Sequence, residues 1–183
     1  LGTIGANLTP TARFMEEGSL SYMISNQKSF NRLNFIAQPY DWLEVSFFYA
    51  DIKNKDYPAS KGSQSYKDKG FNVKFLLLEE NKFLPQLSLG LTDFAGTGIY
   101  SGEFLVGSKK ISKNIDFSIG AGWGLYAGRN GLKNPLIEIN ESFSERNYNF
   151  GETVGEFDIK DYFSGSEVSI FSSVKYDVGE KSS

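Results

Sequence analysis

Hydrophobic and polar residues alternate along most of the chain from Gly18 onward, in short segments separated by polar or glycine-rich gaps. A period of two residues is typical of β-strands whose two faces meet different surroundings. No segment has a convincing helical period. The pattern predicts strands at residues 18–25, 30–38, 42–50, 71–78, 86–92, 99–110, 115–124 and 167–177.

These strands divide into an apolar row and a polar row. If the chain spans a membrane, the apolar row faces lipid and the polar row lines an interior. The clearest lipid-facing candidates are Phe71, Val73, Phe75, Leu77, Leu87, Leu89, Leu91, Phe117 and Ile119. The polar candidates for the lumen are Arg32, Asn34, Glu44, Asn72, Lys74, Gln86, Glu103 and Asp116.

Periodicity by itself does not choose between a membrane barrel and a soluble lipocalin-like barrel or sandwich, because both alternate with period two. Connection lengths favour the membrane barrel: those near Pro39, Glu80 and Ser112 are short, whereas the third (51–66) and the seventh (126–163) are long. Small residues along the polar row, as in Gly120, Gly122 and Gly124, fit a restricted lumen.

Aromatic residues near the strand ends fit the interfacial girdles of a membrane protein. Trp42 and Phe83 lie by the short turns. Those expected by the long loops are Tyr49, Phe94, Tyr100, Trp123 and Tyr126. The sequence therefore predicts an all-β, antiparallel up-and-down transmembrane barrel of about eight strands.

Composition supports strands and excludes several chemistries. The 183 residues include 19 Gly, 16 Phe and 10 Tyr, a composition suited to pleated sheets and turns. With neither Cys nor His, the chain lacks disulfides, thiolate and imidazole metal ligands and the commonest general base. A net charge of -3 argues against a nucleic-acid partner. We expect no enzyme activity, no cofactor and no metal site.

The long segment 126–163 is acidic, and weak binding of divalent cations there is a minor alternative to solvated loop charge. Its spacing matches no calcium-binding loop. The carboxylates concerned are Glu138, Glu141, Glu145, Glu152, Glu156, Asp158 and Asp161.

Several stretches resemble the YjbH/GfcD-type family of outer-membrane barrel proteins. The opening "GANLTPTARFMEEGSL" (5–20) is similar to that family's N-terminal signature, and the block at 65–109 is similar to its longest shared region. Further similar stretches are "AQPYDWLEVSFFYADIKN" (37–54), "GWG" (122–124), "NP" (134–135) and "YFSGSEVSIFSSVKYD" (162–177).

The resemblance implies a non-catalytic protein of the Gram-negative outer membrane, already freed of its signal peptide, that takes part in export or surface assembly of exopolysaccharide or capsule. It also implies outer-membrane lipid, polysaccharide, a lipoprotein and periplasmic export factors as partners. A small binding or structural barrel, either a membrane anchor or a soluble lipocalin-like carrier, is the alternative.

We expect one domain over 1–183, with a lead-in at 1–17 and an extracellular loop at 126–163. Members of the family are several times longer, and the chain ends in "GEKSS" without a terminal aromatic residue. The expectation is therefore the N-terminal part of a larger barrel.

Overall fold

A computed structural model describes residues 3, 5–6, 9–56, 64–96, 98–128, 131–146 and 161–178. It contains one large antiparallel sheet in the order β10-β11-β9-β8-β7-β6-β5-β4-β3 and a small sheet of β1 and β2. The strands of the large sheet are β3 (Leu20–Gln27), β4 (Phe30–Tyr40), β5 (Leu43–Asp56), β6 (Ser65–Leu78), β7 (Gln86–Gly96), β8 (Gly102–Ser112), β9 (Ile115–Gly124), β10 (Leu132–Lys133) and β11 (Glu167–Tyr176).

The predicted strands are all present, and the prediction of an antiparallel up-and-down all-β fold is confirmed. Elements that the alternation did not predict are the short strands β1 (Gly5–Ala6), β2 (Thr9–Pro10) and β10, and the 3-10 helices η1 (Pro135–Glu138) and η2 (Glu141–Ser144). Within the described ranges, no helix has the length and apolar character needed to cross a membrane.

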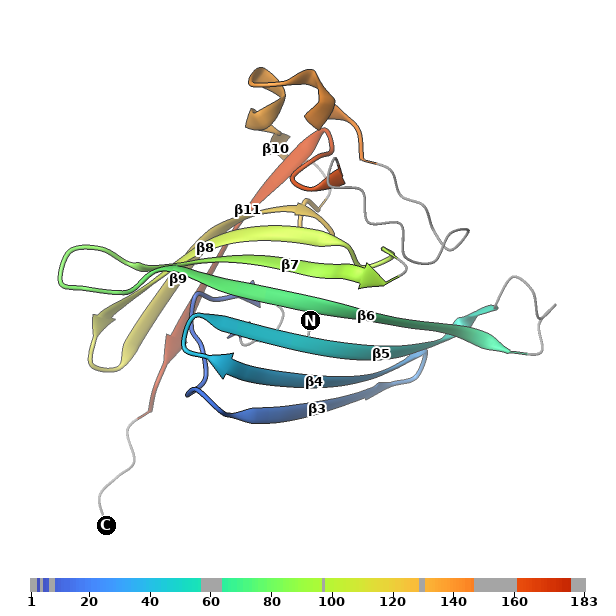
Figure 1. The fold of residues 1–183 in the computed structure, drawn as a ribbon, viewed down its shortest axis with the longest axis horizontal. Coiled ribbons are helices and arrows are strands. Elements are labelled where there is room, and N and C mark those ends of the chain that lie inside the picture. The colour runs from blue at the N-terminus through green and yellow to red at the C-terminus, as the bar shows by residue number, and fades with distance from the viewer. Residues whose placement is uncertain are drawn as a thin grey trace, which may run out of the picture.

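The sheet is strongly curved. In Figure 1, β3 to β8 follow one another from bottom to top, whereas β11 crosses behind them. The N-terminal strands β1 and β2 contact β11, so the start of the chain lies inside the curve. Among the described strands, β3 pairs with β4 alone and thus forms one edge of the sheet.

The connections gather at two ends of the sheet. The turn end holds Asp41–Trp42, Glu79–Pro85 and Lys113–Asn114; the loop end holds Lys28–Ser29 and the connections 57–64, 97–101 and 125–166. The predicted loop 51–66 was too long, because β5 continues to Asp56 and β6 begins at Ser65. Connection length therefore separates the two ends less clearly than expected, and only the connection from β9 to β11 is much longer than the rest.

Cross-strand register assigns strand residues to two faces, because directly paired residues point to the same side of a sheet. On the inner face, Glu44 of β5 pairs with Lys74 of β6. Lys74 in turn pairs with Gly90 of β7, and Gly90 with Phe104 of β8. The inner face follows this row and its neighbours two residues away along each strand.

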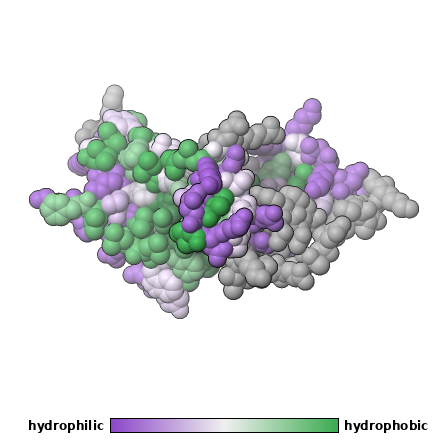
Figure 2. Space-filling model, turned by 90° about the horizontal axis from the view of Figure 1, so that it is seen from above, coloured by the Kyte–Doolittle hydropathy of each residue, from purple (hydrophilic) through white to green (hydrophobic). Residues whose placement is uncertain are grey.

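The outer face carries the opposite rows. Val45 of β5 pairs with Val73 of β6, and Val73 pairs with Leu91 of β7. Many side chains of these rows are exposed although they are apolar, among them Phe35, Phe71, Leu105 and Ile119. Figure 2 shows apolar surface gathered toward the turn end, with polar surface beyond it.

One half of the inner face is packed with aromatic rings. Phe104 and Val106 of β8 are fully buried against Ala12, and Tyr126 and Phe171 pack beside them. A Cβ atom added at Gly90 would lie 2.1 Å from the Phe104 ring. The glycines predicted to line a restricted lumen thus make room for large side chains on neighbouring strands.

Candidate functional site

An N-terminal segment, Thr9–Phe14, crosses the inner face of the sheet, and we call it the interior strap. Its central residue, Ala12, is 0 % exposed. The Ala12 backbone N–H donates to Ser108 Oγ at 2.8 Å, and Ser88 Oγ donates to the Ala12 carbonyl at 3.1 Å. Serine hydroxyls of β7 and β8 therefore satisfy both the N–H and the carbonyl of Ala12, which holds the strap against the face of the sheet.

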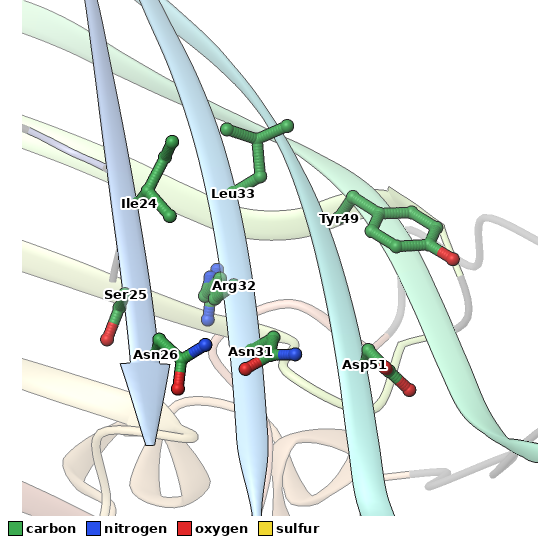
Figure 3. A pocket seen from close by; sticks show the side chains of 8 residues that line it. All are labelled: Ile24, Ser25, Asn26, Asn31, Arg32, Leu33, Tyr49 and Asp51. Carbon is green, nitrogen blue, oxygen red and sulfur yellow. The ribbon is translucent and has the colours of Figure 1, made fainter.

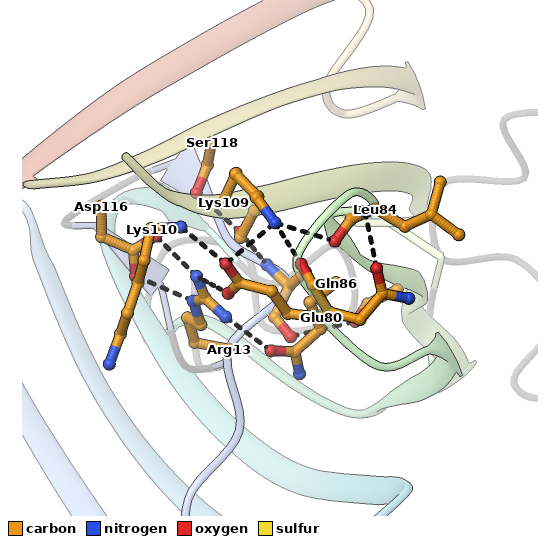
Figure 4. A network of polar contacts seen from close by, with 12 residues as sticks. Arg13, Glu80, Leu84, Gln86, Lys109, Lys110, Asp116 and Ser118 are labelled. Carbon is orange, nitrogen blue, oxygen red and sulfur yellow. Dashed lines mark hydrogen bonds and ion pairs between the residues drawn. The ribbon is translucent and has the colours of Figure 1, made fainter. Parts of the chain in front are cut away.

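Arg13 extends from the strap toward the turn end and joins three parts of the chain (Figure 4). Its Nε and Nη2 atoms donate to the two carboxylate oxygens of Asp116, each at 2.8 Å. Nη1 donates to Gln86 Oε1 at 2.8 Å, and Nη2 lies 2.7 Å from Glu80 Oε2. Such a bidentate pair with further partners fixes a guanidinium in one orientation.

Glu80 lies in the turn between β6 and β7. Besides Arg13 it faces Lys109 Nζ at 3.5 Å and accepts a hydrogen bond from the Lys110 backbone N–H. Burial opposes ionisation of this carboxyl group, but the hydrogen bonds from Arg13 and Lys110 and the nearby positive charges outweigh burial and lower the pKa of Glu80. The turn is therefore held to the strap by an ionised carboxylate.

A buried ion pair between β5 and β6 contacts the interior strap. Lys74 Nζ lies 2.9 Å from Glu44 Oε2, and the two side chains are 0 % and 1 % exposed. Lys74 also donates to the Arg13 carbonyl at 2.7 Å and lies over the Phe14 ring at 4.5 Å. Because a lone charge in such surroundings is very unfavourable, each member of the pair requires the other.

Toward the loop end, the inner face continues as a network of polar groups and rings. The Arg32 guanidinium lies over the Phe48 ring at 4.3 Å and donates to Asn34 Oδ1 at 3.0 Å. Asn72 donates to Ser46 Oγ at 2.8 Å and accepts from the Asp93 backbone N–H at 3.0 Å. These polar residues are buried and bonded within the protein.

The polar residues predicted for a lumen lie on the inner face with one exception. That they line a lumen stays a prediction. The residues on this face are Arg32, Asn34, Glu44, Asn72, Lys74, Gln86 and Asp116.

The prediction for Glu103 was wrong. Glu103 pairs with Leu91 and Trp123, so it lies on the outer face. The reason is that Phe104 and Val106 of the same strand pack inward on the strap and leave Leu105 outside. Three consecutive apolar residues at 104–106 give no alternation from which the orientation could be read.

Glu103 is nevertheless buried, because part of the connection between β9 and β11 covers it. The Arg146 guanidinium makes a bidentate pair with Glu103 at 2.8 Å for both contacts. The Phe163 backbone N–H adds a hydrogen bond to Glu103 Oε2 at 2.9 Å. Trp123 Nε1 donates to Asn134 Oδ1 at 3.0 Å. The described parts of the predicted extracellular loop are thus folded against β8 and β9.

The predicted lipid-facing residues lie in the outer rows. Phe71, Leu77 and Ile119 are about half exposed, whereas Val73 is 8 % exposed. Leu77 falls at a register shift in β6. That they contact lipid stays a prediction. The remaining members of the set are Phe75, Leu87, Leu89, Leu91 and Phe117.

The aromatic residues of the turn end fit the predicted girdle better than those of the loop end. Trp42 and Phe83 are exposed, and Trp42 stacks on Tyr40 at 5.6 Å between ring centroids. The prediction of an interfacial girdle at the loop end was wrong for Trp123, which is covered by Phe163, and for Tyr126, whose ring packs on Phe104. Tyr100 is turned toward Phe48 and Arg32.

In the described parts of the chain, no cluster of three or more Asp, Glu, His or Cys side chains is placed to hold a metal ion. Of the acidic residues predicted as a weak cation site, Glu138 forms an exposed ion pair with Lys133. Glu152, Glu156 and Asp158 lie outside the described residues.

Comparison with known proteins identifies one family. The family described as "Exopolysaccharide biosynthesis protein YbjH" matches residues 1–182. The chain is 35% identical over 178 residues to the "Uncharacterized lipoprotein YjbH" of Escherichia coli (strain K12), a match that covers 96% of this chain and 25% of that protein. The chain thus spans about a quarter of the length of this relative.

No solved structure matches the chain. The family match extends over almost every residue, from the interior strap to the end of β11. The chain therefore belongs to the YjbH family.

Proposed function

We propose that this chain forms part of an outer-membrane β-barrel and that it serves, without catalysis, in the export or surface assembly of an exopolysaccharide. The observation that carries the proposal is the reversal of polarity across the sheet. Ionised and amide side chains are buried on the inner face, whereas leucine, valine and phenylalanine side chains are exposed on the outer face.

Exposure of an apolar surface to water is unfavourable by about 25 cal/mol per Å². Lipid tails remove that cost, because they are as apolar as the side chains. The outer row of β5 runs from Leu43 to Tyr49, and at a rise of about 3.3 Å per residue it covers roughly 20 Å along the strand. Because strands of transmembrane barrels are tilted by about 35–45°, this row spans about 15 Å of the roughly 25 Å apolar band of such a barrel.

The outer row changes character at both ends in the way that a membrane boundary requires. At the turn end it finishes with the exposed rings of Tyr40, Trp42 and Phe83. At the loop end the next outward residues of β5 and β6 are Asp51 and Lys69. Aromatic rings suit the headgroup level, and charged side chains suit the water beyond it.

Among the described residues, two of the four buried carboxylates are paired with cations and are therefore not free to act as a catalytic acid or base. Glu44 faces Lys74, and Glu103 faces Arg146, each within 3 Å. A glycosidase instead needs two carboxyl groups on either side of an open cleft, one of them able to donate a proton. These two carboxylates are neutralised by ion pairs that hold the fold together.

The role in exopolysaccharide is supported by the family description and by the match over the whole chain. The E. coli relative is named a lipoprotein, which fits a place in the cell envelope. Lipoprotein and periplasmic partners belong to the proposal.

Within this role, the filled inner face favours a scaffold over a conduit. The strap, the Phe104 ring and the Lys74–Glu44 pair occupy the space beside β6, β7 and β8 that a glycan would need. A polymer that passes a membrane protein needs exchangeable contacts along an open path. The chain would then hold an exporter in place while other parts conduct the polymer.

Fractionation of cells that express the native gene tests the proposal. We expect the protein in the outer-membrane fraction, extracted by detergent but neither by salt nor by alkaline carbonate. A strain that lacks the gene should release less exopolysaccharide, and the restored gene should recover the yield. A monomer in the soluble fraction without detergent, or an unchanged exopolysaccharide yield, would contradict the proposal.

A further inference from the structure

Two neighbouring rows of side chains mark a sharp boundary on the outer face at the loop end (Figure 3). In the first row, Leu33 of β4 pairs with Ile24 of β3 on one side and with Tyr49 of β5 on the other. Two residues further along each strand, Asn31 pairs with Asn26 and Asp51 in the same manner. An apolar row is thus followed directly by a polar one.

These rows line a surface hollow of about 320 Å³. Its apolar side consists of Ile24, Leu33 and Tyr49, and its polar side includes Asn26, Asn31 and Asp51. Asp51 is already paired, with Ser65 Oγ at 2.5 Å and Lys67 Nζ at 3.6 Å. The Asn31 Oδ1 atom is buried and accepts no hydrogen bond in the structure. The hollow therefore contains an acceptor that still requires a donor.

Positive charge lies beside the polar row. Lys69 pairs with Tyr49 in the sheet register and has an exposed side chain. Lys53 follows Asp51 by two residues on β5, so alternation places it on the same face, and it is also exposed. The surroundings of the hollow are thus suited to an anionic group next to an apolar chain.

We propose that this hollow binds a phosphate-bearing membrane lipid. The first carbons of its acyl chain would lie along Ile24, Leu33 and Tyr49. After a rotation of the Asn31 side chain, whose Oδ1 atom is buried in this structure, a headgroup hydroxyl would donate to that atom, and the phosphate would lie near Lys53 and Lys69. The proposal rests on the membrane location proposed above, because it takes the row boundary as the level at which lipid headgroups begin.

The order of the rows favours a lipid over a free anion. A free phosphate would contact only the lysines, and the apolar side chains of Ile24 and Leu33 would stay exposed to water. A volume of about 320 Å³ is sufficient for a headgroup and a short length of chain. Charge complementarity, a matching apolar side and the unfilled acceptor together point to one amphiphile.

The test measures thermal stabilisation of the full chain in dodecyl maltoside micelles by three compounds at equal concentration. Dioctanoyl phosphatidylglycerol carries both chain and phosphate, dioctanoylglycerol carries the chains alone, and inorganic phosphate carries the anion alone. We expect concentration-dependent stabilisation by phosphatidylglycerol and by neither of the others.

The double variant Lys53→Glu/Lys69→Glu should weaken this binding about 25-fold or more, because each lysine near a lipid surface contributes roughly a fivefold gain in affinity. A matched variant, Lys110→Glu/Lys113→Glu, reverses two exposed lysines at the turn end and should bind as the native chain does. Asn31→Ala should weaken binding by a smaller factor, since it removes one hydrogen bond.

Three results would overturn the proposal: no stabilisation of the native chain by phosphatidylglycerol, equal stabilisation by inorganic phosphate, or equal loss in the two lysine variants. Each leaves the membrane location intact if the protein still requires detergent. A chain that is soluble without detergent would instead refute the proposed function itself.

Discussion

The inner and outer faces of β6 differ in a way that soluble sheets do not. On the inner face, Lys74 is fully buried and reaches Glu44 and the strap carbonyl. On the outer face, Phe71 and Leu77 are about half exposed. A soluble sheet would turn the rings inward and the lysine outward. The proposed membrane location predicts this difference, because the medium outside the sheet would then be less polar than its interior.

The difference also separates two kinds of stability. The inner face is held by specific pairs and hydrogen bonds, each of which depends on a partner at a fixed distance. The outer face depends on the surrounding medium, because many of its apolar side chains are exposed. Substitutions on the inner face should therefore disturb folding in any detergent, and those on the outer face should disturb insertion into a membrane.

The largest effect is expected from Glu44→Ala, which would leave the buried Lys74 charge without its partner. Loss of one member of a buried pair typically costs about 3–5 kcal/mol. Unfolding in detergent with urea measures the loss. A double variant Glu44→Ala/Lys74→Met should recover much of the stability, and an unchanged midpoint for Glu44→Ala alone would show that the pair is not buried.

Leu89→Arg should have the next largest effect, of about 2–4 kcal/mol if the residue lies near the middle of a bilayer. Leu89 pairs with Phe75 and Leu105 in the outer rows. Folding into lipid vesicles at increasing urea concentration gives the free energy. Leu89→Phe keeps the apolar character and serves as the control. Equal folding of the arginine and phenylalanine variants would argue against lipid contact at this row.

Gly90→Ala should destabilise the chain by about 1–3 kcal/mol, because overpacking forces neighbouring groups to shift. The added methyl group would lie 2.1 Å from the Phe104 ring. Gly107→Ala is the matched control, since its nearest neighbour would be 3.7 Å away. Phe104→Leu should partly rescue Gly90→Ala. Equal melting temperatures for the two alanine variants would mean that the ring is not packed on β7.

The smallest effect concerns pH and the Arg13–Glu80 contact. The pKa of Glu80 is lower in the folded chain than its ordinary value of 4.5, so the contact stabilises fully above that value. Its contribution is lost as the pH falls below 4.5 through the folded pKa. The difference in melting temperature between the native chain and Glu80→Gln should therefore shrink between pH 6 and pH 3. A difference that does not change with pH would mean that ionisation of Glu80 does not contribute to the stability of this contact.

The sequence was sufficient to predict the strands and, for most of them, which side chains lie on the inner face and which on the outer face. Alternation in 71–78 and 86–92 separates Lys74 from Phe75 and Ser88 from Leu89, and the structure places these residues on opposite faces. Alternation failed to predict the orientation of β8, because the three consecutive apolar residues 104–106 show no period of two. Ser88 and Gly90 also lie on the inner face, where the strap contacts Ser88 and the Phe104 ring covers Gly90.

The interior strap could not be predicted from local pattern. Ala12 contacts Ser108, and Arg13 contacts Asp116, across about a hundred residues of chain. Neither Ala12 nor Arg13 lies in a segment of alternating polarity, and the residues beside them in the sequence do not indicate that they are buried. The one available signal was the resemblance of "TPTAR" to a family signature, which the strap now explains in structural terms.

Accessibility of single spin labels tests the contact with lipid most directly, and the absence of native cysteine makes the labelling specific. Labels at Leu89 and Leu105 on the outer rows would be compared in lipid vesicles with a label at Lys53, which lies beyond the apolar rows. We predict that oxygen relaxes the labels at Leu89 and Leu105 much more than a water-soluble nickel chelate does, and that the label at Lys53 shows the reverse. Equal access of the nickel chelate to Leu89 and Lys53 would contradict the account.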